Sequence, residues 1–177
     1  MSEKVEFETL YSILRDISAS LDSGAHVRDV METIVMKSAQ MFKASGAVIR
    51  ILNPKTRHLD LGAAYGLSDQ YLSKGPSFRE ESIMEFCRQN KVMVIRDILN
   101  DPFVQYPKEA WAEGIRMMVD APITYRDEVL GILRIYFDEP KEFSETELQY
   151  LILIAERGPL SSRGQSRSRG KNPVMIS

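Results

Sequence analysis

Hydrophobic residues in the first 42 positions recur three and four residues apart, a spacing that places them on one face of a helix. We therefore expect a helix over residues 4–22 and a second helix over residues 25–42, with Ser23 as the N-cap of the second. After residue 45 the pattern changes to short runs rich in β-branched residues, which indicate strands. The expected strands cover residues 46–53, 59–65, 92–95, 117–125 and 129–137.

Turn and cap signals between these runs organise the strands into two hairpins. Asn53-Pro54 and Arg126-Asp127 begin tight turns, so we expect the strands on either side of each turn to pair antiparallel. Pro122 cannot donate a ladder hydrogen bond and predicts a bulge or an unpaired stretch in its strand. Ser144 and Glu147 form a capping box that starts the last helix. Terminal helices with strands and short inserted helices between them predict an α+β fold.

Composition favours one domain followed by a tail. A chain of 177 residues with 44% hydrophobic residues can bury one sizeable core. We expect a single domain over residues 1–158, with the N-terminal helix at 4–22 and the core at 25–158. Residues 159–177 are rich in Ser and Arg and include no acidic residue, which favours a disordered tail. The tail is compatible with a free-standing module and with a truncated or frame-shifted longer chain.

Charge and cysteine content narrow the classes of function. The net charge of −2 gives no overall attraction to nucleic acid or anionic membranes, and no apolar run reaches the roughly 20 residues that span a bilayer. The N-terminus lacks the apolar stretch of a secretory signal. Cys87 is the only cysteine, so neither an intramolecular disulfide nor a multi-cysteine zinc site can form. We therefore expect a cytoplasmic protein with no metal, no cofactor, and no nucleic-acid or membrane partner.

Three charged residues interrupt otherwise apolar strands and are the main candidates for chemistry. Asp120 lies in the middle of the segment MMVDAPI, where a buried carboxylate requires a charged or hydrogen-bonding partner. It either orients a ligand in a pocket or accepts hydrogen bonds from backbone N–H groups near Pro122. Arg50 and Arg134 form a fork for a carboxylate or phosphate if both face one pocket. Otherwise their stems extend along the apolar surface toward acidic partners.

The register of the second hairpin decides which of these groups meet. A two-residue turn at Arg126-Asp127 pairs Asp120 with Leu133 and places Asp120 and Arg134 on opposite faces of the sheet. A longer turn or a bulge reverses that placement. Both registers are open from the sequence.

A series of short motifs follows a fixed order along the chain. It consists of Tyr65-Gly66-Leu67, the apolar segment from Ile83 to Ile95, Asp97 with Asp101-Pro102, Gly114-Ile115-Arg116, Ala121-Pro122, Glu128-Val129-Leu130-Gly131 and Phe143-Ser144. In order and spacing this series resembles the GAF domain, a small-molecule sensor module of signalling proteins, over about residues 8–158. The spaced Asn-Lys, Phe and Asp-Glu set of cyclic-nucleotide-binding members has no counterpart here, which argues against a cyclic nucleotide as the ligand.

The resemblance implies a central antiparallel sheet of five to six strands in the order 2-1-5-4-3, numbered along the chain. It places the N- and C-terminal helices on one face, and short helices and loops over a pocket on the other face, as in GAF and PAS domains. Aromatic and apolar residues then either line and roof the pocket or form a core beneath the loops. With the charged residues added, the candidate ligand-binding residues are Arg50, Tyr65, Phe78, Phe86, Asp97, Tyr106, Trp111, Met118, Asp120 and Arg134.

Three functions fit these features. The first is a non-enzymatic sensory domain for signal transduction that binds a small organic or anionic ligand. It would form a homodimer through its terminal helices, with Leu10, Leu14, Leu148 and Leu151 at the seam. The second is a redox enzyme similar to the GAF-type methionine sulfoxide reductases, which requires a reactive Cys87 and is disfavoured by a single cysteine. The third is a ligandless scaffold that only dimerises, with bulky side chains filling the pocket. The sequence favours the first.

Overall fold

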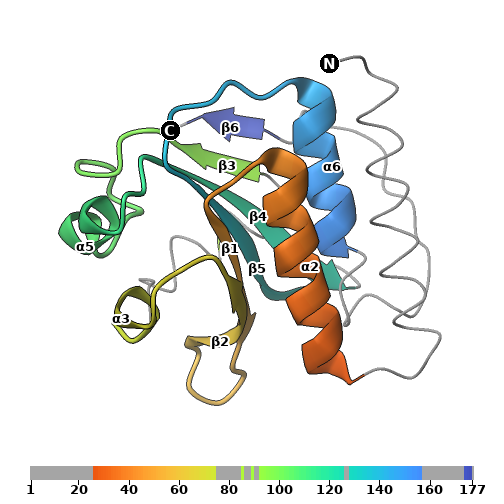
Figure 1. The fold of residues 1–177 in the computed structure, drawn as a ribbon. Coiled ribbons are helices and arrows are strands. Elements are labelled where there is room, and N and C mark those ends of the chain that lie inside the picture. Colours follow the sequence, from red (N-terminus) through yellow and green to blue (C-terminus); the bar gives the residue numbers. More distant parts are fainter. Residues whose placement is uncertain are drawn as a thin grey trace.

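A six-stranded sheet forms the centre of the molecule (Figure 1), in a computed structural model that describes residues 26–74, 85, 89, 92–125, 128–156 and 174–176. The strand order is β2-β1-β5-β4-β3-β6. The strands are β1 (Gly46–Leu52), β2 (Leu59–Tyr65), β3 (Val92–Ile95), β4 (Met117–Tyr125), β5 (Glu128–Phe137) and β6 (Val174–Ile176). The first five strands pair antiparallel in the predicted order 2-1-5-4-3, which confirms the α+β fold.

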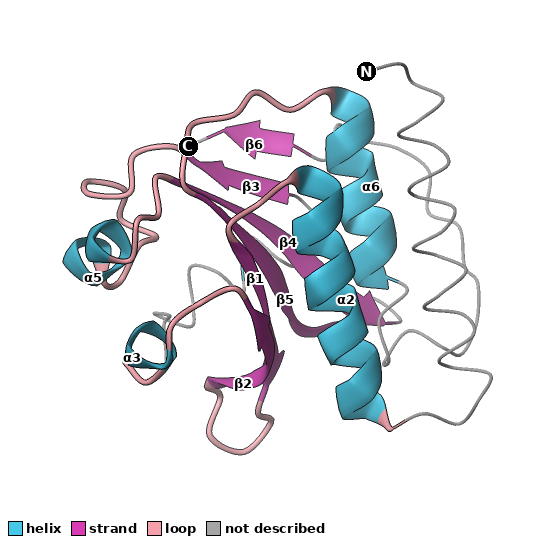
Figure 2. Ribbon diagram, in the orientation of Figure 1, coloured by secondary structure: helices cyan, strands magenta, loops and turns pink. Residues whose placement is uncertain are grey.

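Helices cover the two faces of the sheet unequally (Figure 2). The long helices α2 (Val27–Phe42) and α6 (Glu145–Glu156) pack against one face, and the short helices α3 (Asp69–Leu72) and α5 (Pro107–Ala112) lie over the other. Helix α2 begins with His26 at its N-cap. The prediction of Ser23 as the N-cap is therefore wrong, because an N-cap directly precedes the first helical residue. The helix expected over residues 4–22 lies outside the described residues.

Successive side chains along each strand point to opposite faces of the sheet, and each face has its own apolar core. In β1, Ala47 and Ile49 face the long helices, whereas Val48 faces the short ones. Leu148 and Leu151 of α6 are buried in the core under the long helices. These two leucines, which were predicted to contact a second subunit, therefore pack in the chain's own core. The other predicted seam residues, from the first helix, lie outside the described part of the chain.

A bulge fixes the register of the second hairpin. The register of β4 against β5 shifts between Ile123 and Thr124, and beyond this point Asp120 pairs with Arg134 rather than with Leu133. Of the two registers open from the sequence, the bulged one is realised. Directly paired residues share one face of a sheet, so both charged side chains lie on the face that carries the short helices.

The β3 edge of the sheet differs from the sequence prediction. Strand β3 pairs with β4 only from Met118 to Asp120, so Pro122 has no strand partner on that side, while on the other side it pairs with Ile132 of β5. On its other side, β3 pairs in parallel with residues 174–176. The prediction of a disordered tail over residues 159–177 is wrong for these residues, because their sequence Val-Met-Ile suits the open edge of a sheet. Residues 157–173 lie outside the described part of the chain.

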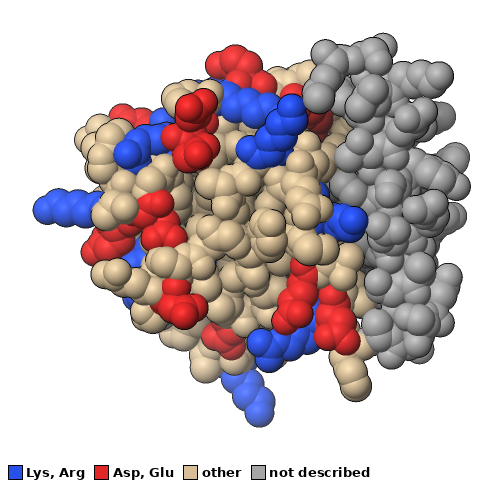
Figure 3. All heavy atoms as spheres, in the orientation of Figure 1, with Lys and Arg blue, Asp and Glu red and all other residues tan. Residues whose placement is uncertain are grey.

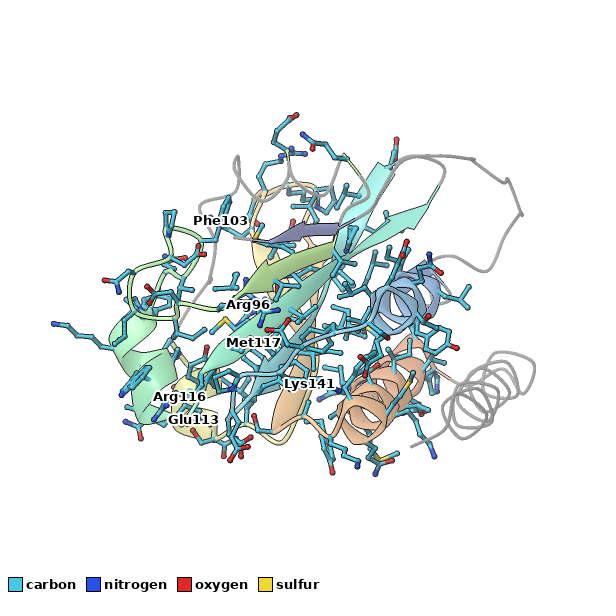
Figure 4. All side chains as sticks on the ribbon, turned by 90° about the horizontal axis from the view of Figure 1, so that it is seen from above. Arg96, Phe103, Glu113, Arg116, Met117 and Lys141 are labelled. Atoms are coloured by element: carbon cyan, nitrogen blue, oxygen red, sulfur yellow. The ribbon has the colours of Figure 1, made fainter. Side chains whose placement is uncertain are left out.

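Polar contacts fix the start of α6. The predicted capping box is confirmed, since Glu147 N donates to Ser144 Oγ at 3.2 Å and Ser144 N donates to Glu147 Oε2 at 2.9 Å. Arg96, just after β3, lies close to Met117 (Figure 4) and donates from Nη1 to the Lys141 carbonyl oxygen at 3.0 Å. These contacts tie the end of β3 to the loop that leads into the helix.

Charged side chains of both signs lie around the rim of the face shown in Figure 3, and uncharged side chains occupy its middle. This mixing agrees with a net charge of only −2.

Among the described residues, no helix combines the length and the apolar character that crossing a bilayer requires.

Candidate functional site

A buried ion pair stands in the middle of the sheet face that carries the short helices. Arg134 donates from Nε to Asp120 Oδ1 at 2.5 Å and from Nη2 to Asp120 Oδ2 at 2.6 Å, and each residue is 3% exposed. Burial alone lowers the pKa of Arg134, but the charge of Asp120 and these two hydrogen bonds raise that pKa above its ordinary value. The main partner of Asp120 is thus an arginine, which neither sequence interpretation of this residue included.

Arg50 of β1 is the second buried guanidinium on this face, a diagonal neighbour of Arg134 on the paired strand β5. It is 7% exposed, and its Nη1 donates to the Leu59 carbonyl oxygen at 3.4 Å. Its Nε has no hydrogen-bond partner among the described residues. Burial is the main cause that lowers the pKa of Arg50. Both arginines face the same side, as a fork requires, but within the described part of the chain only Arg134 has a carboxylate partner.

Tyr71 of α3 and Tyr136 of β5 form an aromatic wall beside the arginines. Their rings meet edge to face, with centroids 5.8 Å apart and an angle of 87° between the ring planes. Burial raises the pKa of both hydroxyl groups. Both therefore stay neutral at ordinary pH and keep a proton that can be donated to an acceptor.

Lys74, just after α3, brings a third basic group to this place. Its Nζ lies 2.9 Å from the centroid of the Tyr71 ring and 5.5 Å from that of the Tyr106 ring. Burial lowers the pKa of Lys74 to about 8. Sequence reasoning missed this residue because it lies in a segment with no regular hydrophobic pattern.

These side chains surround a small hollow between the sheet and the short helices. Its volume is about 20 Å³, and one water molecule needs roughly 10–15 Å³ by the same measure. Among the described residues, no carboxylate lines it. The lining residues are Arg50, Tyr71, Lys74, Val104, Gln105, Tyr106, Met118, Arg134 and Tyr136.

Hydrogen bonds connect the two segments that carry α3 and α5. Glu113, at the end of α5 (Figure 4), accepts hydrogen bonds from Ser68 N and from Ser68 Oγ, both at 2.7 Å. Ser68 is also the N-cap of α3, where Tyr71 N donates to its Oγ at 3.1 Å. One carboxylate therefore joins segments that are 45 positions apart in the sequence.

Comparison with known families decides what kind of domain holds this hollow. The sequence model described as "GAF domain" matches residues 24–157 of the chain. The chain belongs to the GAF domain family. No curated protein matches it.

Solved GAF domains share the fold of this chain. The GAF domain of an Acinetobacter phosphoenolpyruvate-protein phosphotransferase has a TM-score of 0.70 at 20% identity, covering 91% of this chain and 92% of that chain. The phycocyanobilin-bound GAF domain of a cyanobacterial phytochrome has a TM-score of 0.67 at 20% identity, covering 84% and 90%. A domain of a putative two-component sensor histidine kinase from Sinorhizobium meliloti has a TM-score of 0.64 at 18% identity, covering 75% and 88%. At these identities the likeness concerns the fold.

The predicted ligand-binding residues of this GAF domain differ in whether they line the hollow. Asp120 supports the hollow indirectly, since it binds Arg134. Phe78, Phe86 and Cys87 lie outside the described residues. Those that line the hollow are Arg50, Tyr106, Met118 and Arg134.

Three candidates lie elsewhere and do not line this hollow. Tyr65 is 39% exposed, and the alternation of β2 places it on the side of the long helices. Trp111 is 44% exposed and stacks on the Arg116 guanidinium, whose Cζ lies 3.7 Å from the ring centroid. Asp97 stabilises a turn, where its Oδ1 accepts a hydrogen bond from Asn100 N at 3.2 Å.

Proposed function

We propose that this GAF domain is a non-enzymatic sensory module that binds a small anionic ligand in the hollow, with Arg50 as the main anion-binding group. The observation that carries the proposal is the buried Arg50 guanidinium, whose Nε has no partner among the described residues. Burying a charge without a partner is unfavourable, so buried charges are normally paired. A carboxylate or phosphate oxygen next to Nε would supply the missing acceptor.

The charges around the hollow favour an anion over other ligands. Asp120 is already engaged by Arg134, and no described carboxylate faces the hollow. A hydrogen bond between a guanidinium and an anion contributes about 1.5–3 kcal/mol. The neutral hydroxyl groups of Tyr71 and Tyr136 hydrogen-bond to each other, so one of their protons is left as a further donor. A cation or an apolar ligand would leave Arg50 unpaired.

Strand β1 offers a path from the hollow to the long helices. Arg50 faces the hollow, whereas Ile49 and Ile51 on either side of it pack in the core under α2. A ligand that binds Arg50 and displaces its strand would favour one packing of β1 against α2 over another, which is a population shift between two arrangements of the strand and the helix. In this proposal a homodimer formed through the terminal helices carries the signal onward.

The fold relatives support a signalling role. They include a phytochrome GAF domain with bound phycocyanobilin and a domain of a putative two-component sensor histidine kinase. Both are parts of proteins that receive a signal. The proposal assigns this chain to the same general class, with an anion in place of a pigment.

The proposal is tested by the melting temperature of the protein in formate, acetate, pyruvate, phosphate and sulfate, each compared with chloride at equal ionic strength. A ligand that binds only the folded state stabilises it by about 2.7 kcal/mol at 100 times its Kd. Arg50→Met keeps the apolar stem and removes the charge. We expect this variant to be as stable as the wild type or about 1 kcal/mol more stable without ligand, and to lose the response to anions.

Arg28→Met is the matched control, because it makes the same change of charge at an exposed position on α2, where the side chain is 79% accessible. It should retain the full response. An Arg50→Met variant that still responds to anions would show that Arg50 is only a structural group. A wild-type protein that responds to none of the five anions would contradict the anion site itself.

The size of the hollow favours a second candidate, a ligandless dimerisation scaffold. A volume of about 20 Å³ holds one or two water molecules, so an organic ligand requires the covering segments to move apart. Native mass spectrometry under gentle and denaturing conditions separates the two candidates. An extra mass that is lost on denaturation supports the sensor, and a dimer with no added mass and no anion response supports the scaffold.

A further inference from the structure

Lys74 faces the same hollow as the two arginines but comes from the segment after α3 and not from a strand of the sheet. It belongs to the segment of residues 68–74, which carries α3 over the hollow. Its Nζ lies over the face of the Tyr71 ring, 2.9 Å from the centroid. A tyrosine ring attracts an ammonium group less strongly than an anion does, so this contact can be replaced when an anion enters.

Charged groups from several elements surround Lys74. Glu109 of α5 and Glu113 after it favour the charged amine, whereas Arg50 and Arg134 of the sheet disfavour it. The rings of Tyr71 and Tyr106 also lie near the amine. Burial is the largest effect and lowers the pKa of Lys74 to about 8. Half of the Lys74 side chains are therefore uncharged near pH 8 when the hollow is empty.

We propose that Lys74 is a second charged anion-binding group of this site beside Arg50, which exchanges the Tyr71 ring for the bound anion and closes residues 68–74 over it. This inference rests on the proposed function of the hollow as an anion site. The other end of the segment is anchored by Ser68 to Glu113, so Lys74 can move while the segment stays attached to α5. The anion is then held by Arg50 from the sheet and by Lys74 from the cover.

Contact with an anion changes the protonation of Lys74. The negative charge favours the ammonium form, so the pKa of Lys74 is higher in the complex than in the free protein. Binding therefore takes up a proton at pH values between the free and the bound pKa. The affinity is fully present below about pH 8, where Lys74 is already charged, and falls by up to about tenfold per pH unit above it.

Isothermal titration with formate and with sulfate tests this, at about pH 7 and about pH 9.5, where neither anion titrates. Two buffers of different ionisation enthalpy give the number of protons taken up. For the wild type we expect Kd to rise several-fold, up to about tenfold, between the two pH values, with proton uptake at the higher pH. Lys74→Met should bind about tenfold more weakly at pH 7 and take up no proton. Lys108→Met, at an exposed lysine of α5, should behave as the wild type.

The outcomes distinguish this inference from the function on which it rests. Anion binding by Lys74→Met within about twofold of the wild type, with the same proton uptake, would overturn the role of Lys74 and leave the Arg50 site intact. Failure of both anions to bind the wild type would refute the proposed function and this inference together. If Lys74→Met does not fold, as judged by circular dichroism, the wild type alone decides, since binding without proton uptake overturns the proposal.

Discussion

The buried pair of Asp120 and Arg134 allows a quantitative test of the energetics of this sheet. Asp120→Leu leaves the Arg134 guanidinium buried without its carboxylate, and Arg134→Met leaves both Asp120 oxygens without the donors at 2.5 and 2.6 Å. Breaking a buried pair from one side destabilises a protein by about 3–5 kcal/mol. Replacing both partners by apolar residues of similar volume is often close to neutral. We therefore expect each single variant to lose at least about 3 kcal/mol and the double variant to lose at most about 2 kcal/mol.

The double-mutant cycle then shows a coupling of at least about 4 kcal/mol between the two residues. Unfolding in urea, followed by far-UV circular dichroism, measures it. Fluorescence of Trp111, the single tryptophan, is less suitable, because this residue is exposed on a short helix away from the pair.

The control cycle uses Arg28 and Glu32, an exposed pair one helical turn apart on α2 with an N–O distance of 3.1 Å. A pair of this kind couples by about 0.3–0.5 kcal/mol. Additive effects of Asp120→Leu and Arg134→Met, or a coupling as small as that of the control, would refute the conclusion that the buried pair is a single energetic unit.

Two further predictions concern local structure. Ser144→Ala removes the acceptor for Glu147 N and should lower the free energy of unfolding, measured in urea, by about 1 kcal/mol. Ser144→Asp keeps an acceptor at this position and should restore the stability. Equal stability of the wild type and both variants would contradict the capping role. Gly131→Ala places a Cβ that overlaps the Arg50 carbonyl oxygen on the neighbouring strand, so this variant should lower the free energy of unfolding by roughly 3 kcal/mol. A variant as stable as the wild type would argue against the close approach of β1 and β5.

The elements of the fold were predictable because their signals are local. Strand β3 begins and ends where the apolar run does, and the Ser144 capping box appears where the sequence places it. The order of the strands came from the resemblance to a family, since pairing between distant segments leaves no periodic trace in one sequence. The short β6 was missed because the composition of the whole tail hides its three apolar residues.

The site was less predictable because it depends on register. The bulge at Ile123 and Thr124 decides that Asp120 meets Arg134. Pro122 and Gly131 lie beside it and signal an irregularity, but they do not fix how many residues the register shifts. The strand that ends at Tyr65 lacks clear alternation, so its face could not be inferred. Lys74 depends on the packing of α3 against the sheet, which a sequence pattern does not encode.

The three buried charges contribute to the fold in different ways. A sheet face selected only for stability would carry apolar residues at these positions, as it does at Val48 and Met118. The charge of Arg134 is balanced by Asp120, so that pair persists whether or not a ligand is present. The Nε of Arg50 is not balanced among the described residues, and an entering anion would satisfy it. Removal of the Arg50 charge should therefore keep or raise stability and abolish the response to anions, whereas breaking the Asp120–Arg134 pair should lower stability.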